Sequence, residues 1–89
     1  MKIKLELFGA SREFSNKDHL DFNLNKKISI KDFRKEIINY VDQNFKGNEN
    51  FKKIIQTSAF CSEDNNIIGD NYKIIKDQKI GIIPPIGGG

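Results

Sequence analysis

The sequence predicts an α+β domain in which one main helix packs across a mixed β-sheet. Two segments near the N-terminus, 2–8 and 18–24, alternate polar and apolar residues, which is the pattern of half-buried strands. Between 30 and 45, apolar residues recur three and four positions apart, which predicts an amphipathic helix. The run 79–83 is apolar on both faces and predicts a strand in the middle of the sheet.

Length and charge limit the number of domains and the classes of partner. The 89 residues make one domain, and seven phenylalanines with many isoleucines supply a core. The net charge is only +3, and the lysines are scattered among acidic and amide residues, so we expect no nucleic-acid partner. No apolar run reaches the roughly 20 residues of a membrane span, and the alternating N-terminus is not a signal peptide. We expect a cytoplasmic protein without a membrane partner.

The first two strands predict an N-terminal hairpin. Ile3, Leu5 and Leu7 point inward from the first strand, and Phe8 follows them. The segment 9–13 breaks the alternation and predicts a loop. The second strand turns its apolar residues inward in the same way: Leu20, Phe22 and Leu24.

The helix has signals at both ends. Ser29 is a good N-cap, and Asp32 stands three positions later, where it could complete a capping box. Gly47 is expected to be the C-cap. The apolar stripe, which we expect to face the core, comprises Ile30, Phe33, Ile37, Tyr40 or Val41, and Phe45.

The second half of the chain gives shorter signals. The polar segment 48–53 carries Phe51 as an anchor, and a third strand is predicted around 57–61. Residues 62–66 form a turn cluster, followed by a very short strand at 67–68. The segment 72–75 fits either a short strand or a helical turn, and 77–78 reads as a turn.

These elements fit one arrangement. A hairpin, a crossing helix and a central C-terminal strand beside the first strand together form the β-grasp arrangement of ubiquitin-like domains. We expect the β-grasp domain to span 1–83 and a flexible tail to span 84–89.

The tail is the most informative feature for function. Pro84 and Pro85 exclude an inner strand or helix, and the glycines at 87–89 cannot contribute to a core. A frayed end would also be glycine-rich. The apolar strand, however, enters Pro84 with no linker between them, which favours an arm that presents the carboxylate of Gly89.

Side chains for other chemistry are scarce. Cys61 is the one cysteine, and we expect it to be a half-buried strand residue. A catalytic thiol would need a base nearby, and the one histidine, His19, belongs to a different predicted strand. The chain therefore has almost no side chains suited to metal catalysis or nucleophilic catalysis, and we expect no permanently bound cofactor.

The chain opens with Leu7-Phe8-Gly9-Ala10-Ser11-Arg12-Glu13, and it ends with Ile80-Gly81-Ile82-Ile83-Pro84-Pro85-Ile86-Gly87-Gly88-Gly89. Both segments resemble those of the small subunits of molybdopterin synthase, the MoaD type of sulfur carrier. The family usually has an acidic–Gly–acidic turn before the last strand, whereas this chain has Asp77-Gln78-Lys79. Aromatic residues often precede the family's prolines, and here isoleucines stand there.

The resemblance implies a carrier that is not itself an enzyme. An adenylating enzyme of the ubiquitin-E1-like class would activate the carboxylate of Gly89 with ATP, and a sulfur donor protein would convert it to a thiocarboxylate. The tail would then enter the large subunit of molybdopterin synthase and give sulfur to cyclic pyranopterin monophosphate. The residues that would insert are Pro84, Pro85, Ile86, Gly87 and Gly88. Phe8, Ile82 and Ile83 are expected near the partner-binding face, although core packing is the alternative role for each.

Two other functions fit the same ending. The chain could be a related carrier for thiamine thiazole synthesis or tRNA thiolation, or a protein modifier. It could also be a ubiquitin-like module that only binds, with an inert tail. A β-grasp ferredoxin is excluded because its iron–sulfur cluster needs four cysteines.

Overall fold

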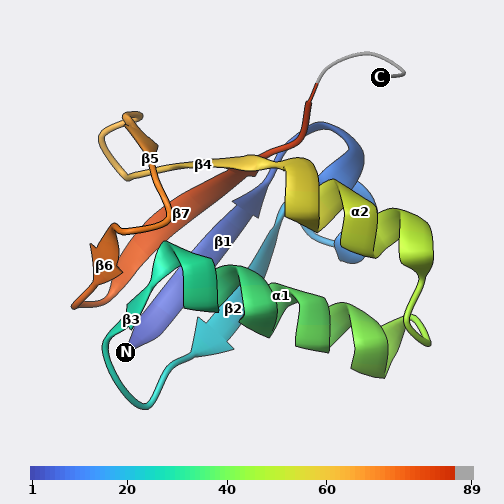
Figure 1. The fold of residues 1–89 in the computed structure, drawn as a ribbon, viewed down its shortest axis with the longest axis horizontal. Coiled ribbons are helices and arrows are strands. Elements are labelled where there is room, and N and C mark those ends of the chain that lie inside the picture. Colours follow the sequence, from blue (N-terminus) through green and yellow to red (C-terminus); the bar gives the residue numbers. More distant parts are fainter. Residues whose placement is uncertain (86–89) are drawn as a thin grey trace.

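The structure, a computed structural model, describes residues 1–85 (Figure 1). Its main sheet has five strands in the order β2-β1-β7-β4-β5. The two helices α1 and α2 lie on one face of this sheet and leave the other face open. The strands of the main sheet are β1 (Lys2–Leu7), β2 (His19–Asn23), β4 (Ala59–Cys61), β5 (Ile67–Ile68) and β7 (Gln78–Ile83).

The C-terminal strand β7 occupies the centre of the sheet, as predicted. It runs parallel to β1, with Leu5 opposite Ile80, and antiparallel to β4, with Phe60 opposite Ile82. β1 also pairs with β2 in the expected antiparallel hairpin. Ile80 and Ile82 are fully buried beneath the helices. The β-grasp arrangement predicted from the sequence is confirmed.

Helix α1 (Ile30–Asn44) begins where the sequence predicts. The hydroxyl oxygen of Ser29 accepts a hydrogen bond from the backbone N–H of Asp32 at 3.2 Å. The carboxylate of Asp32 lies 3.8 Å from the amine of Lys35, and within residues 1–85 no hydrogen bond returns from it to Ser29. The buried stripe of the helix consists of Ile30, Phe33, Ile37 and Val41.

The end of α1 differs from the prediction. Phe45 is the C-cap, and its backbone N–H donates to the carbonyl of Val41. The turn to the left-handed region comes after it, at Lys46 (φ 54°) and Gly47 (φ 67°). Gly47 therefore serves the left-handed turn beyond the helix, where its lack of a Cβ atom is needed, and is not the cap itself.

A second helix, α2 (Glu49–Thr57), replaces the predicted polar segment and the start of the third strand. Asn48 is its N-cap and accepts from the backbone N–H of Phe51 at 3.1 Å. The strand that follows, β4, has only three residues, Ala59–Cys61. The prediction of a third strand beginning near Thr57 was therefore wrong at its N-terminal end.

Three short elements complete the fold. The predicted loop after β1 is a 3-10 helix, η1 (Gly9–Phe14). The segment with two possible structures contains a strand, β6 (Lys73–Ile74), which pairs with β3 (Ile28–Ser29) in a separate two-stranded sheet. Gln78 belongs to β7 and not to the predicted turn.

The core lies between the sheet and the two helices. Phe14, Phe33 and Phe60 are its largest fully buried side chains. Phe51 from α2 packs on Phe14 with ring centroids 5.1 Å apart, so the second helix and η1 share one cluster. Within residues 1–85, no helix is both long and apolar enough to cross a membrane.

Candidate functional site

The chain leaves the sheet between η1 and α2. Ile83 ends β7, and Pro84 is buried against the body of the domain. A Cβ atom added to Gly9, which has φ +54°, would lie 3.9 Å from Cδ and Cγ of Pro84. Pro85 is exposed. The body of the domain therefore holds Pro84, and within residues 1–85 only Pro85 of the predicted tail is exposed. The other residues predicted for the tail lie outside the described residues: Ile86, Gly87, Gly88 and Gly89.

Phe8 is an exposed apolar residue on the open face beside this exit. Its side chain is 45% exposed, although it directly follows the buried strand β1. The ring lies over Gly81 of β7, because a Cβ atom at that position would come 2.9 Å from Cε2 of Phe8. The same Cβ atom would come 2.7 Å from Sγ of Cys61. The absence of a side chain at Gly81 lets the ring of Phe8 and the thiol of Cys61 rest on the sheet.

The three residues predicted at the partner face differ in exposure. Phe8 is accessible, Ile83 is half-buried and Ile82 is fully buried in the core. The period of two along a strand explains the difference, because Ile82 points toward the helices and Ile83 points away from them. Any contribution of Ile82 to a partner surface is therefore indirect, through packing.

The connection η1 holds Phe8 in place. The hydroxyl of Ser11 donates to the carbonyl of Phe8 at 2.6 Å, and Ser11 is fully buried. At the end of η1, the hydroxyl of Tyr40 donates to the carbonyl of Phe14 at 2.8 Å. The first bond closes the start of η1 on its own N-cap, and the second ties the end of η1 to α1. Arg12 and Glu13, which carry part of the family resemblance, are exposed between them.

A groove of about 390 Å³ lies on the other side of the exit, where α2 faces η1 and the two prolines. Sequence reasoning missed it because α2 was not predicted. The signal that could have revealed the helix is Asn48 followed by Phe51, Ile54 and Ile55, an N-cap before helical apolar spacing. The groove is lined by Ala10, Asn50, Lys53, Ile54, Thr57, Pro84 and Pro85.

The arginine of α1 fixes the C-terminal end of α2 beside this groove. The guanidinium of Arg34 donates to the carbonyls of Ile55 at 2.6 Å and Ser58 at 2.9 Å. It also lies 4.8 Å from the centroid of the Phe60 ring. These contacts give the carbonyls at the end of α2 a charged donor, in addition to the backbone N–H of Ser58 that reaches Ile55, so Arg34 positions α2 against the sheet.

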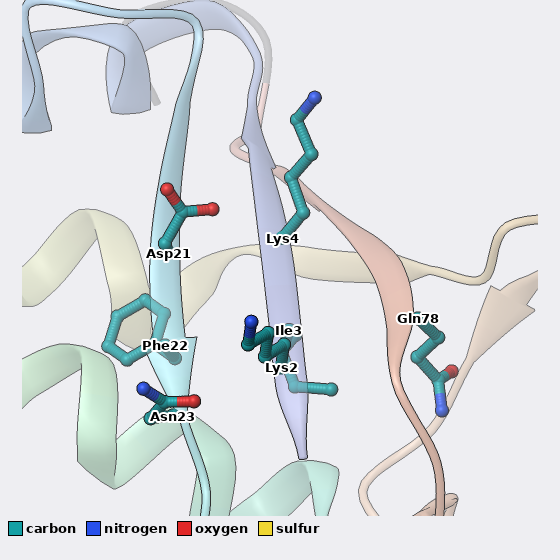
Figure 2. Close-up of a pocket in the computed structure, with 7 residues that line it drawn as sticks. All are labelled: Lys2, Ile3, Lys4, Asp21, Phe22, Asn23 and Gln78. Atoms are coloured by element: carbon teal, nitrogen blue, oxygen red, sulfur yellow. The ribbon is translucent and has the colours of Figure 1, made fainter.

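A second groove, of about 430 Å³, lies at the opposite end of the open face (Figure 2). Figure 2 shows that its side chains come from β1, β2 and β7. Two lysines, one aspartate and neutral side chains are mixed there, so the charges favour neither an anion nor a cation. Its lining residues are Lys2, Ile3, Lys4, Asp21, Phe22, Asn23 and Gln78.

The thiol and the imidazole lie apart, as the sequence predicts. Cys61 is in β4 and His19 is in β2, with β1 and β7 between them in the sheet. His19 Nδ1 lies 2.9 Å from Asp18, and this hydrogen bond lowers the pKa of the Asp18 carboxyl below its ordinary value of 3.8. No group of three or more potential metal ligands gathers within residues 1–85.

Solved structures match this fold, although no protein-family model matches the sequence and no curated protein matches it. One match is the "putative molybdopterin converting factor, subunit 1" of Pyrococcus furiosus, at 17% identity and a TM-score of 0.68. The alignment covers 96% of this chain and 98% of that one. Another is SAMP1 of Haloferax volcanii, at 10% identity and a TM-score of 0.68, with all of both chains covered. At these identities the likeness establishes the ubiquitin-like fold.

Proposed function

We propose that this chain is a ubiquitin-like sulfur carrier, and specifically the small subunit of molybdopterin synthase. The observation that carries the proposal is the exit of the tail: the central strand β7 passes directly into Pro84 and Pro85, which precede the glycines. Because β7 is paired on both sides, by β1 and β4, it fixes the point from which the tail leaves the domain. The fold shared with the Pyrococcus furiosus molybdopterin converting factor supports the same function.

The proposed chemistry takes place at the carboxyl group of Gly89. An α-carboxylate is ionised at neutral pH and can attack the α-phosphorus of ATP, releasing pyrophosphate and forming an acyl adenylate. A sulfide equivalent from a donor protein then displaces AMP and leaves a thiocarboxylate. The thiocarboxylate would give its sulfur to cyclic pyranopterin monophosphate in the large subunit.

The narrow tail suits this path. Glycine residues have no side chains, so they can pass through the wall of a partner's active site where larger residues would collide. The proline pair restricts the backbone before the glycines and so lowers the conformational entropy lost when the tail docks. The carrier supplies the reacting group, while its partners supply ATP, catalytic acids and bases, and sulfur.

The comparisons leave room for a second candidate. SAMP1 matches with the same TM-score as the putative molybdopterin converting factor, so the fold alone does not single out the molybdopterin role. A carrier for thiamine thiazole synthesis or tRNA thiolation would use the same activated glycine. A binding module with an inert tail would not.

Intact-mass spectrometry tests the proposal directly. The chain ending at Gly89 is incubated with an E1-like adenylating enzyme, ATP and a sulfur source, and a variant lacking Gly89 serves as the matched control. A gain equal to the replacement of one oxygen by sulfur, present in the chain and absent from the variant, is the expected result. An unchanged mass would overturn the carrier function and favour the binding module.

Co-purification then separates the branches of carriers. A molybdopterin synthase large subunit is expected to copurify with the chain. Recovery of a thiazole synthase or a tRNA sulfurtransferase in its place would assign the chain to the second candidate.

A further inference from the structure

The short reach of the tail constrains the enzyme that activates it. Pro85 is the last described residue, and the four residues after it can span at most about 14 Å when fully extended. If Gly89 is adenylated, as proposed above, the active site must come within this distance of Pro85. Protein surrounding that active site must therefore contact the surfaces beside Pro85.

Two such surfaces flank the exit, on opposite sides of the sheet. One is the exposed ring of Phe8 on the open face, and the other is the groove between α2 and η1 on the helix side. Pro84 and Pro85 themselves form part of the wall of that groove. An enzyme that encloses the residues after Pro85 therefore meets the groove before it meets more distant parts of the carrier.

The groove has a defined chemical character. Ile54, Pro84 and Pro85 give it apolar walls, and Asn50 and Thr57 provide neutral polar groups. Among the lining residues of the described part of the chain, 1–85, Lys53 is the only charged one, and its side chain is exposed. Within residues 1–85 its amine takes part in no ion pair, whereas the neighbouring Lys52 lies 2.9 Å from the carboxylate of Asp42.

We propose that this groove is a docking site for the E1-like adenylating enzyme, which inserts an acidic side chain beside an apolar one. The acidic side chain pairs with Lys53, and the apolar side chain packs on Ile54 and the prolines. Lys53 gives the groove a positive charge, so an acidic residue is its complementary partner. The proposal rests on the carrier function and adds a second contact surface to the exposed ring of Phe8.

Steady-state kinetics of ATP-dependent adenylation tests the groove. The probe is the E1-like adenylating enzyme of the same genome, assayed by pyrophosphate release with the full chain as the varied substrate. The test variants are Lys53→Glu, which reverses the charge, and Asn50→Tyr, which fills the groove. Lys73→Glu in β6 makes the same charge change at a position outside the groove and is the matched control. Circular dichroism checks that each variant is folded.

Lys53→Glu is expected to raise the KM for the carrier about 10-fold with little change in kcat, because reversal of a charge at an interface weakens the encounter. The increase is expected to shrink as salt is added. Asn50→Tyr is also expected to raise the KM, and Lys73→Glu is expected to leave it unchanged.

The failures of the two proposals are distinguishable. If the wild-type chain is adenylated and both groove variants keep the wild-type KM, the groove proposal is overturned and the carrier function stands. If the enzyme does not adenylate the wild-type chain, the carrier function fails and the groove proposal fails with it. An equal KM increase in Lys73→Glu would show a general effect of charge and also overturn the groove.

Discussion

The ring of Phe8 occupies the space that a side chain on Gly81 would need, since a Cβ atom there would lie 2.9 Å from its Cε2 atom. The sulfur of Cys61 closes the other side of the same space, 2.7 Å from that Cβ position. The exposed aromatic residue at the exit is thus seated by a glycine in the central strand. The position of Phe8 therefore depends on position 81 as well as on η1.

Gly81→Ala is expected to displace the ring of Phe8 and to lower the free energy of unfolding by about 1–2 kcal/mol, the usual cost of overpacking. Urea denaturation measures the loss. Gly69→Ala is the matched control, because a Cβ atom there meets nothing within 4 Å. Adding Cys61→Ala to Gly81→Ala should recover part of the loss, as a double-mutant cycle would show. Additive effects would mean that the thiol does not cause the strain.

Arg34→Met is expected to destabilise the fold by about 2–3 kcal/mol, because two carbonyls at the end of α2 would lose a charged donor. The carbonyls are those of Ile55 and Ser58, which accept hydrogen bonds from the guanidinium at 2.6 and 2.9 Å. Arg34→Lys should also lose stability, since an ammonium lacks the planar fork that reaches several acceptors. Arg12→Met, at an exposed position of η1, is the control for removing an arginine. Equal stability of the Arg34 and Arg12 variants would contradict the role of Arg34.

The sheet and α1 could be predicted from the sequence because their patterns are long and regular. Alternation in β1 and β2 and the stripe of α1 each extend over several residues, and β7 is apolar on both faces. For β7 the sequence also predicts the position in the sheet, because a strand buried on both faces has to lie inside the sheet. Local pattern and tertiary burial agree in these elements.

The sequence pattern of α2 does not distinguish a helix from a strand. Ile54 and Ile55 lie side by side before a polar pair, so a nine-residue helix and the entrance to a strand look alike. The groove at the exit was missed for the same reason. The pairing of β3 with β6 joins two-residue segments far apart in the sequence, and no local pattern specifies such a contact.

Tyr40 should make the fold sensitive to alkaline pH. Burial raises the pKa of Tyr40 above its ordinary value of 10.0, so the unfolded chain loses this proton first. The stabilisation is therefore complete below pH 10.0 and is lost as the pH rises through the pKa of the folded state. The Tyr72→Phe variant leaves Tyr40 as the one tyrosine. Its phenolate absorbance should appear at a higher pH in the folded variant than in the same variant after denaturation.

Tyr40→Phe is the companion variant. It is expected to lose about 1 kcal/mol of stability at neutral pH, because the hydroxyl no longer donates to the carbonyl of Phe14. The decrease in stability that remains above pH 10.0 should be smaller in this variant than in the wild type. The same alkaline loss in both proteins would show that another group is responsible.

Phe8→Ala and Ile82→Ala should separate partner binding from core packing. Ile82 is fully buried, and its truncation is expected to cost about 2–5 kcal/mol of stability. Phe8 is 45% exposed, so its truncation should cost less stability and should weaken binding to the large subunit. Chemical denaturation and calorimetric titration of the large subunit measure the two effects. Unchanged affinity of a folded Phe8→Ala chain would assign Phe8 to packing alone.

Gly89→Ala and deletion of Gly89 are expected to abolish carrier function and to leave the free energy of unfolding unchanged. A methyl group on the last residue would widen the tail where the proposed adenylating site would enclose it, and deletion would move the carboxylate one residue back along the chain. The core between the sheet and the helices is formed by other residues, from Ile3 to Ile82. Thermal unfolding checks the stability, and intact mass after incubation with ATP, adenylating enzyme and sulfur source checks the carrier. Thiocarboxylate formation at the wild-type rate on the chain lacking Gly89 would refute the assignment of the reacting group.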